Sequence, residues 1–197
     1  MNQHKIIIIT APSGAGKTSI VHYLLQKYPQ QFAFSISATT RIPRKNETDG
    51  KDYYFLSEAL FRSKIQNNEF VEWEMVYEGK YYGTLQAELE RIWEMGKTPI
   101  LDIDVKGALH IQRRYPESSF SLFIQPPSVE ELKKRLESRG TETRESLDAR
   151  VNKASYELSF KDHFNYAIIN KNLESACAEA EKVIMTVLDQ PNLSVQC

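Results

Sequence analysis

KIIIITAPSGAGKTS, residues 5–19, joins a run of β-branched residues to a loop of small residues that ends in Lys-Thr-Ser. Consecutive isoleucines are typical of a strand that is buried on both faces, and such strands lie at the centre of parallel sheets. Residues 16–28 then repeat apolar side chains at helical spacing, and Pro29 ends the pattern. The stretch therefore predicts a buried strand, a loop and a helix in direct succession.

The loop follows the phosphate-binding pattern G-x-x-x-x-G-K-[ST] except at its first position, which holds Ala11. In such loops, backbone N–H groups and the N-terminus of the next helix surround phosphate oxygens. Lys17 is expected to contact the β- and γ-phosphates of a nucleotide, and Thr18 to offer its hydroxyl to Mg²⁺. Alanine is the least bulky replacement for glycine, so we expect the loop to form. Its predicted nucleotide-binding residues are Ala11, Pro12, Ser13, Gly14, Ala15, Gly16, Lys17 and Thr18.

This pattern does not name a reaction, because GTPases, ATPases and small-molecule kinases all carry it. The opposing interpretation is a glycine turn below a core helix, with an incidental lysine. Strand, loop, Lys-Thr pair and helix follow one another in the required register, which favours the phosphate loop.

The composition is that of an ordinary globular chain. Its 197 residues suffice for one compact domain, and 41% are hydrophobic and 26% charged. Lys and Arg number 25 against 26 Asp and Glu, which argues against a general nucleic-acid binder. Cys177 and Cys197 form no disulfide framework, and no apolar run approaches the ~20 residues that span a bilayer. We therefore expect a cytoplasmic protein with no membrane association.

Strand and helix patterns alternate along most of the chain. Buried strands are predicted at 98–103, 120–125 and 166–169, and helices at 104–115, 128–138, 146–160 and 174–189. This alternation predicts an α/β fold with a parallel sheet and helices on both of its faces. Residues 34–95 differ, because short aromatic-rich runs alternate there with turn signals such as Asp49-Gly50. That texture predicts a small, mostly antiparallel lobe inserted into the core.

The stretch SATTRIPRKNETDGKDYYF, residues 37–55, carries the spacing R-x-P-R-x-x-E-x-D-G-x-D-Y-x-F. With EFVEWE, YYGT, LDID and PPSVEELKKRLESRGTET, in this order, it closely resembles the guanylate kinase family. The similarity runs from about Ile6 to about Leu188 and includes the phosphate loop. It implies Mg²⁺-dependent transfer of the γ-phosphoryl group of ATP to GMP or dGMP, giving ADP and GDP, in purine nucleotide metabolism and GMP recycling. ATP and GMP would be the small-molecule partners, with no obligate protein partner.

The resemblance also implies how a single guanylate-kinase-like domain is divided. A phosphate-loop core would comprise residues 1–34, 96–127 and 161–190, with a GMP-binding lobe at 35–95, a helical lid at 128–160 and a tail at 191–197. In the lid, Arg135, Arg139 and Arg150 match by position the catalytic arginines of the family. A solvated charged helix face is the alternative interpretation for such a run.

Arg41 and Arg44 lie three residues apart, with Pro43 restricting the backbone between them. Two planar guanidinium groups beside tyrosine hydroxyls suit a phosphate monoester dianion. A lone arginine pair would more simply be a solvated basic loop. The resemblance implies that this pair, with Tyr53 and Tyr82, holds the GMP phosphate.

Glu72 is the candidate for reading the base. A carboxylate can accept hydrogen bonds from N1–H and the 2-amino group of guanine, whereas adenine has an acceptor at N1 and no 2-amino group. The alternation F-V-E-W-E alone favours an exposed strand position, and only the resemblance implies base recognition. Ser37 and Thr84 would then bond the O6 side of guanine, and Asp104 another amino proton.

Asp102 and Asp104 occupy the carboxyl end of a predicted strand, where open α/β sheets bind ligands. Alternation along that strand predicts both carboxylates on one face. The resemblance implies that Asp102 supports Mg²⁺ through water and that Asp104 points toward the acceptor nucleotide. Capping of the following helix is the simpler role for Asp104.

The resemblance places Asn170 beside the adenine of ATP. Near this strand the family commonly has Asp-Tyr and Asn-Asp pairs, whereas this chain has Asn165-Tyr166 and Asn170-Lys171. Lys171 either alters the preference for the donor base or lies in a tolerant exposed loop.

Two other functions stay open. A non-catalytic guanylate-kinase-like module would use the pocket of Arg41, Arg44 and Tyr53 for a phosphorylated protein, but such modules have degraded phosphate loops. A kinase for another small phosphate acceptor would share the same core, although Glu72 favours guanine.

Overall fold

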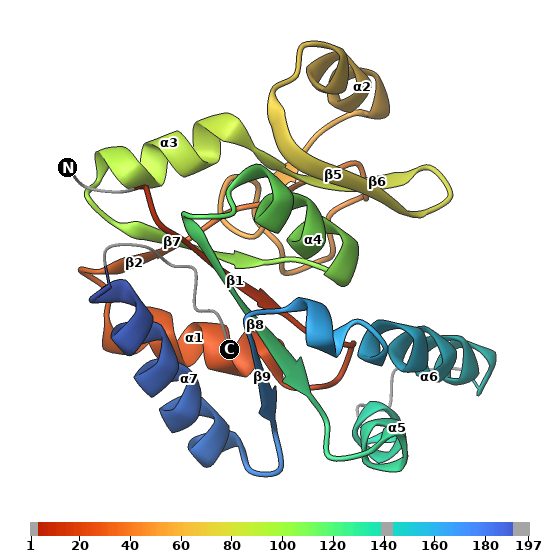
Figure 1. Ribbon diagram of the computed structural model, residues 1–197. Coiled ribbons are helices and arrows are strands. Elements are labelled where there is room, and N and C mark those ends of the chain that lie inside the picture. The colour runs from red at the N-terminus through yellow and green to blue at the C-terminus, as the bar shows by residue number, and fades with distance from the viewer. Residues whose placement is uncertain (1–3, 139–143, 191–197) are drawn as a thin grey trace.

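The computed structural model describes residues 4–138 and 144–190, which form two sheets with helices around them (Figure 1). The larger sheet has the strand order β2-β7-β1-β8-β9, and every neighbouring pair is parallel. Its strands are β1 Ile6–Thr10, β2 Phe32–Phe34, β7 Thr98–Asp102, β8 Ser119–Gln125 and β9 Tyr166–Ile169. β1 lies at the centre, because its isoleucines are fully buried on both faces of the sheet.

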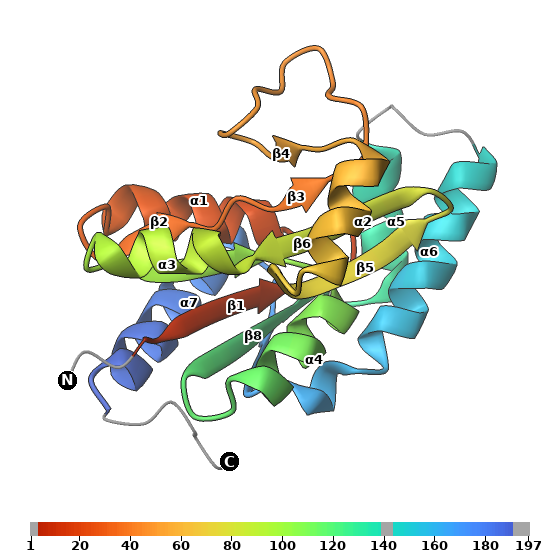
Figure 2. The same cartoon turned by 90° about the horizontal axis from the view of Figure 1, so that it is seen from above.

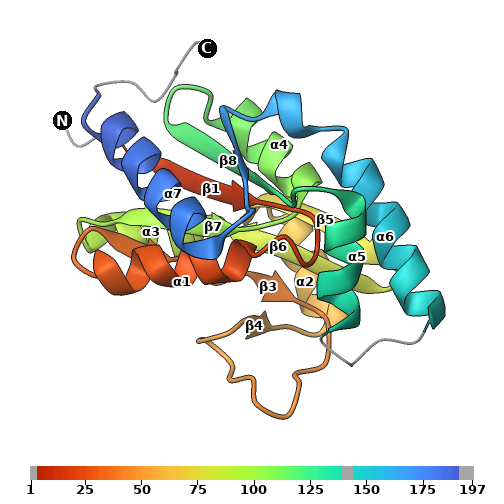
Figure 3. The ribbon, with the colours of Figure 1, turned by 90° about the horizontal axis from the view of Figure 1, so that it is seen from below.

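Helices cover both faces of this sheet, as predicted. Ile7 and Ile9 of β1 pack in one core with α1 and α7, whereas Ile6 and Ile8 pack in a second core with α3 and α4. The four helices are α1 Lys17–Lys27, α3 Gln86–Glu94, α4 Val105–Arg114 and α7 Leu173–Leu188. α1 and α7 lie side by side on their face (Figure 3).

A smaller sheet with the order β4-β3-β6-β5 lies beyond one edge of the core (Figure 2). Its strands are β3 Ala38–Thr39, β4 Tyr54–Phe55, β5 Phe70–Tyr77 and β6 Lys80–Leu85. The β3–β6 and β5–β6 pairs are antiparallel and the β3–β4 pair is parallel, so the sheet is mixed. Helix α2, Glu58–Gln66, buries Phe61 against it, where its ring stacks on Phe70 with centroids 4.4 Å apart.

The pattern of residues 34–95 does not predict α2 and α3. Each helix has only nine residues, about two and a half turns, and therefore shows little apolar spacing in the sequence. α2 buries a single side chain, Phe61, and α3 buries Leu89 and Ile92 against the core. α3 lies within the interval 35–95 but packs on β7 of the large sheet.

Helices α5, Val129–Glu137, and α6, Arg144–Leu158, lie beyond the carboxyl end of β8 (Figure 3). The Ser128 hydroxyl accepts a hydrogen bond from the Glu131 amide (3.1 Å) and thereby caps α5. α6 begins two residues before its predicted start, and a short 3₁₀ helix, Lys161–His163, follows it. No helix within the described ranges is long and apolar enough to cross a membrane. Arg139 and residues 191–197 lie outside the described residues.

The central strand marks the switch point of the large sheet. β7 pairs on one side of β1 and β8 on the other, so the chain leaves β1 toward opposite edges. In open parallel sheets, a crevice forms at the carboxyl ends of such strands. The phosphate-binding sequence follows β1 directly, and β7 ends at Asp102.

Candidate active site

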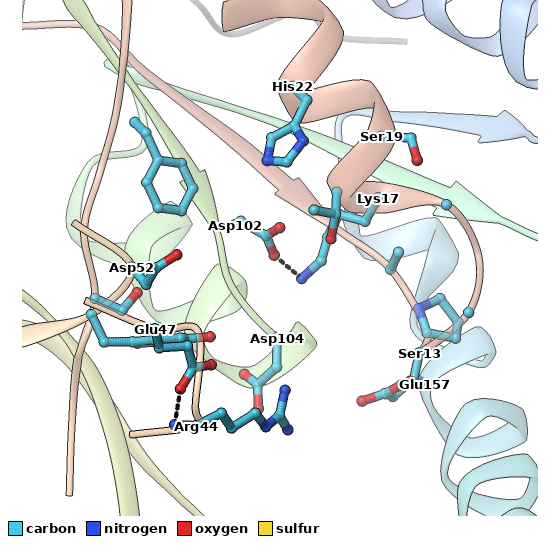
Figure 4. Close-up of a pocket in the computed structure, with 18 of the residues that line it drawn as sticks. Ser13, Lys17, Ser19, His22, Arg44, Glu47, Asp52, Asp102, Asp104 and Glu157 are labelled. Carbon is cyan, nitrogen blue, oxygen red and sulfur yellow. Dashed lines mark hydrogen bonds and ion pairs between the residues drawn. The ribbon is translucent and has the colours of Figure 1, made fainter. Parts of the chain in front are cut away.

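A cavity of about 760 Å³ lies at this switch point (Figure 4). The loop after β1 and the start of α1 form one wall, residues from the lobe region a second, and α6 a third. The lining residues from the predicted site are Ala11, Pro12, Ser13, Gly14, Gly16, Lys17, Thr18, Ser37, Arg44, Tyr53, Asp102, Asp104 and Arg150. The tertiary structure thus brings together segments that lie up to 139 residues apart in the sequence, from Ala11 to Arg150.

The loop has the geometry of an anion-binding turn. Gly14 and Gly16 have φ values of 90° and 97°, in the left-handed region that favours glycine. The first turn of α1 has no side-chain cap and no acidic residue, so its N–H groups remain for an anion in the cavity. A Cβ at residue 16 would lie 2.3 Å from Asn170 Nδ2, which also excludes a side chain there.

Ala11 needs no glycine conformation. Among the described residues only Asn68 combines a side chain with a positive φ, so Ala11 has a φ that alanine readily adopts. Its methyl group is buried (6% exposed) in the core that contains α1 and α7. The departure from the pattern therefore adds apolar packing without straining the loop.

We expect Ala11→Gly to leave kcat and KM within about threefold of the wild type. The variant should lose about 1 kcal/mol of stability, because glycine removes a buried methyl group and adds unfolded-state entropy. Urea unfolding and steady-state kinetics measure the two effects. A large gain in activity would show instead that Ala11 impairs the loop.

Lys17 lies between two acceptors at the end of β7. Its ammonium forms an ion pair with Asp102 (Figure 4). It also donates a hydrogen bond to the Ile103 carbonyl (3.1 Å). β7 ends at Asp102, so Asp104 is not on the strand, and the predicted alternation does not extend to it. Asp104 instead caps α4 by accepting a hydrogen bond from the Gly107 amide (2.9 Å), and both carboxylates still line the cavity.

Arg41 and Arg44, the predicted arginine pair, make different contacts with Glu47. Arg41 makes a two-pronged ion pair with Glu47, with N–O distances of 2.8 and 2.9 Å, and lies over the ring of Tyr53. The Arg44 amide donates to Glu47 (2.7 Å), and Arg44 reaches the cavity with its side chain. The Arg41 guanidinium and the Arg44 amide hold the pKa of Glu47 at about 2. Glu47 therefore stays ionised and occupies Arg41 in this structure.

Tyr53 and Tyr82 complete the same cluster. Their rings meet edge to face with centroids 6.1 Å apart, and the Tyr82 hydroxyl interacts with Arg41. Tyr53 lines the cavity, whereas Arg41 and Tyr82 are not part of its lining. Arg41, Tyr53 and Tyr82 are therefore neighbours, and Arg44 lines the same cavity as Tyr53.

Glu72 is buried, not exposed as its strand alternation alone would suggest. It is 6% exposed on β5, and its carboxylate accepts a hydrogen bond from the Thr84 hydroxyl (2.7 Å) on β6. A Cβ at residue 107 would lie 2.7 Å from Glu72 Oε2, so Gly107 allows α4 to approach the carboxylate. Burial raises the pKa of Glu72 to about 7, with a contribution from the negative charge of Asp104, and the Thr84 hydroxyl only partly offsets this.

The raised pKa of Glu72 predicts a pH-dependent loss of stability. The folded protein retains a proton on Glu72 that the unfolded chain releases above pH ~4.5, so stability falls as the pH rises from there through about 7. This shift corresponds to about 3 kcal/mol at pH 8. Glu72→Gln should therefore be more stable than the wild type at pH 8 and should lose this advantage near pH 5. Urea unfolding at both pH values measures the difference, and an equal difference at both would contradict the assignment.

The buried side chain of Asn170 contacts the backbone of the phosphate loop. Asn170 is 4% exposed, and its side-chain amide donates to the Ala15 carbonyl (2.8 Å). The backbone carbonyl of Asn170 accepts a hydrogen bond from Arg135 Nη2 (3.0 Å), and Arg135 also pairs with Glu131. Arg135 and Asn170 therefore lie together outside the lining of the cavity, whereas Arg150 is part of that lining.

The two departures near β9 have different surroundings. The Asn165 side-chain oxygen accepts hydrogen bonds from the Ser121 amide and hydroxyl, both at 2.9 Å. Asparagine thus provides the acceptor that an aspartate would provide at this position. Lys171 is exposed.

Nine lining residues of the cavity received no role from the sequence, among them Glu47, Lys153 and Glu157. Glu47 stands inside the R-x-P-R-x-x-E spacing, and its distance of three residues from Arg44 was a usable signal. Lys153 and Glu157 follow Arg150 at helical spacing, so a shared helix face could have been inferred for all three. Nothing in the sequence alone indicates that this face turns toward the phosphate loop.

The guanylate kinase family model matches residues 3–187. The chain belongs to the guanylate kinase family. A guanylate kinase of Bacteroides fragilis is 50% identical over 184 residues, covering 93% of this chain and 90% of the relative. One of Porphyromonas gingivalis is 46% identical over 180 residues, covering 91% and 96%. The crystal structure of the guanylate kinase of Anaplasma phagocytophilum matches with a TM-score of 0.75 at 28% identity, covering 95% of this chain and 87% of that one.

These comparisons confirm the family resemblance and the fold expected from it. The match extends beyond the phosphate loop to the lobe region and to both helices α5 and α6.

Proposed function

We propose that this protein transfers the γ-phosphoryl group of ATP to GMP or dGMP, producing ADP and GDP or dGDP, in purine nucleotide metabolism. The observation that carries this proposal is one cavity lined both by the phosphate loop with Lys17 and by Arg44 and Tyr53. A donor phosphate on the loop and an acceptor phosphate at the arginines would then meet within a single space. Both nucleotides are cytoplasmic metabolites, which supports a cytoplasmic location.

Catalysis needs positioning and charge neutralisation more than a protein base. The attacking oxygen of a nucleotide monophosphate is already anionic near neutral pH, because its second pKa is about 6. Lys17 would leave its pair with Asp102 as the more highly charged phosphates of ATP enter, and would neutralise the transferring group. Arg150 already lines the cavity from α6.

Arg135 and Arg139 remain proposed lid cations. In the described structure Arg135 bonds Glu131 and the Asn170 carbonyl, so it must exchange these partners to reach a phosphate. Asn170 lies beside the loop, which supports its proposed place near the adenine.

The residues present fit a magnesium ion. Mg²⁺ prefers oxygen ligands and usually retains several waters, with phosphates and one or two side chains completing its shell. Thr18 and Asp102 supply a hydroxyl and a carboxylate to the same cavity. The ion, when bound with ATP, would neutralise phosphate charge, with Thr18 as a direct ligand and Asp102 acting through water.

The acceptor is proposed to lie between the two sheets. Arg41, Arg44, Tyr53 and Tyr82 would hold its phosphate, and Arg41 would then share its guanidinium between Glu47 and the ligand. Glu72, Ser37, Thr84 and Asp104 would contact the guanine. The buried Glu72 carboxylate has only the Thr84 hydroxyl as a hydrogen-bond donor among the described side chains, which leaves acceptor capacity for N1–H and the 2-amino group.

The proposal is tested by ADP release from Mg-ATP with GMP, dGMP, AMP, UMP and CMP as separate acceptors. Strong turnover with GMP and dGMP only is the expected result. Equal turnover with several bases would contradict guanine recognition. GMP binding without turnover would indicate the non-catalytic module instead.

A further inference from the structure

Glu157 is a buried carboxylate that the proposed reaction does not use. It lies near the end of α6, is 7% exposed, and reaches the main cavity (Figure 4). It also borders a smaller adjoining hollow of about 150 Å³, which Asp104 lines as well. Glu157 therefore lies where α6 meets the site.

The carboxylate of Glu157 has few partners. Within the described ranges its one ion pair is with Lys153, one helical turn earlier, at 3.7 Å. No hydrogen bond to its carboxylate oxygens is found among the described residues, apart from the interaction with Lys153. Buried carboxylates are costly unless several donors surround them, so the remaining acceptor capacity calls for an explanation.

Glu88 provides a comparison within the same molecule. It is 2% exposed, and its two oxygens accept from the Ile36 amide, the Tyr54 hydroxyl and two nitrogens of Arg91, at 2.6–2.9 Å. This is the pattern of a structural carboxylate, because four donors saturate it. Glu72 and Glu157, the other buried glutamates among the described residues, lack that saturation, and both neighbour Asp104.

Asp104 is a neighbour that Glu72 and Glu157 have in common. A Cβ at residue 107 would lie 2.7 Å from Glu72 Oε2 and 3.5 Å from Asp104 Oδ1, and Asp104 and Glu157 both line the smaller hollow. Asp104 is therefore a neighbour of both carboxylates, whereas Glu72 lines neither that hollow nor the main cavity. Burial is the main reason that the pKa of Glu157 is raised, which agrees with a carboxylate that still lacks donors.

The chemistry of guanosine fits this arrangement. The 2-amino group lies on the edge of guanine that carries the sugar, so a base read by Glu72 and Asp104 directs its ribose past Asp104. A phosphate would be repelled by another carboxylate, whereas a ribose hydroxyl is a neutral donor that a carboxylate accepts well. We propose that Glu157 accepts a hydrogen bond from the 2′-hydroxyl of GMP and thereby favours GMP over dGMP.

This inference rests on the proposed function, since it assumes that GMP is the acceptor. It adds a specificity-determining residue on α6, outside the lobe region that holds all the other proposed GMP contacts except Asp104. Lys153, which pairs with Glu157 at 3.7 Å, partly offsets the effect of burial on the pKa of this carboxyl group.

The test compares kcat/KM for GMP and for dGMP in the wild type, Glu157→Ala and Glu157→Gln. Glu157→Ala should reduce kcat/KM for GMP by about tenfold or more, the usual effect of losing a hydrogen bond to a charged group. For dGMP, which lacks the 2′-hydroxyl, the change should stay below about threefold. Glu157→Gln retains an acceptor oxygen, so its kcat/KM for GMP should lie between those of the wild type and Glu157→Ala. Asp148→Asn, an exposed acid on the same helix, serves as the control and should leave both substrates unchanged.

Several outcomes would overturn the inference. An equal loss for GMP and dGMP would show that Glu157 supports the fold of α6, and a raised Mg²⁺ requirement with both would indicate contact with metal-bound water. A wild type that does not distinguish the two nucleotides would also refute it. Calorimetric binding of GMP and dGMP without ATP gives the same comparison independently of turnover. If the wild type binds GMP better than dGMP, loses this preference in Glu157→Ala and yet phosphorylates neither nucleotide, the proposed reaction fails while this inference stands.

Discussion

Replacing Lys17 with alanine is expected to reduce kcat by about 10²- to 10³-fold or more, while GMP affinity stays within about threefold of the wild type. Lys17 is the cation at the turn between the loop and α1, and it lies in the cavity wall opposite the arginine–tyrosine cluster. Its loss removes charge from the donor phosphates, where charge develops during transfer, but leaves the acceptor contacts in place. Steady-state kinetics and calorimetric GMP binding measure the two effects separately.

Lys27→Ala is the matched control for this variant. Lys27 is a lysine at the other end of the same helix, where it pairs with Glu181 at the surface (2.7 Å), away from the cavity. Its replacement should change kcat by less than about twofold. Turnover of Lys17→Ala close to that of Lys27→Ala would refute the role assigned to Lys17. Because Lys17→Ala also leaves Asp102 without its ion-pair partner, thermal unfolding must show that the variant is folded.

Glu72→Ala is expected to raise the KM for GMP by at least about 10²-fold, with little change in the KM for ATP. The carboxylate is held by Thr84 in a buried position, so its loss would leave N1–H and the 2-amino group of guanine without this acceptor. At saturating GMP, kcat should fall much less than kcat/KM, because the lost contact is made equally before and during transfer.

Glu90→Ala controls for the loss of an acid, since Glu90 is exposed on α3 and bonds only Gln86 among the described residues. It should leave both KM values unchanged. The same Glu72 variant should also lose discrimination between GMP and AMP, because AMP gains nothing from the carboxylate. An unchanged KM for GMP, or undiminished discrimination, would refute base recognition by Glu72.

Much of the core could be predicted from the sequence, because its signals are local. Four consecutive isoleucines predict a strand buried on both faces, and the helical pattern after Gly16 ends at Pro29. β1, β7, β8 and β9 lie within one residue of their predicted positions, and α1, α4, α5 and α7 agree equally well. The lobe region was less predictable, since α2 and α3 each expose most of one face and are only nine residues long.

Some features of the candidate site could likewise be predicted from the sequence, and others could not. The phosphate loop is contiguous in sequence, so its residues and its glycine requirements could be identified from spacing alone. The states of individual side chains could not. Nothing local indicates that Glu47 occupies Arg41, that Asn170 supports Ala15, or that Arg135 lies outside the cavity lining.

The sequence by itself determined the phosphate loop, the central parallel strand and the resemblance to guanylate kinases, because each depends on residues close together in the chain. Only the tertiary structure decided which carboxylates are buried and which of them lack donors. Nothing in the sequence distinguishes the glutamates at positions 72, 88 and 157 from exposed ones, yet all three are buried. Glu88 accepts hydrogen bonds from four donors, whereas Glu72 and Glu157 are neighbours of Asp104 and retain acceptor capacity. The physical reason is that desolvation and charge act through space, so they depend on which distant segments the fold brings to the end of β1.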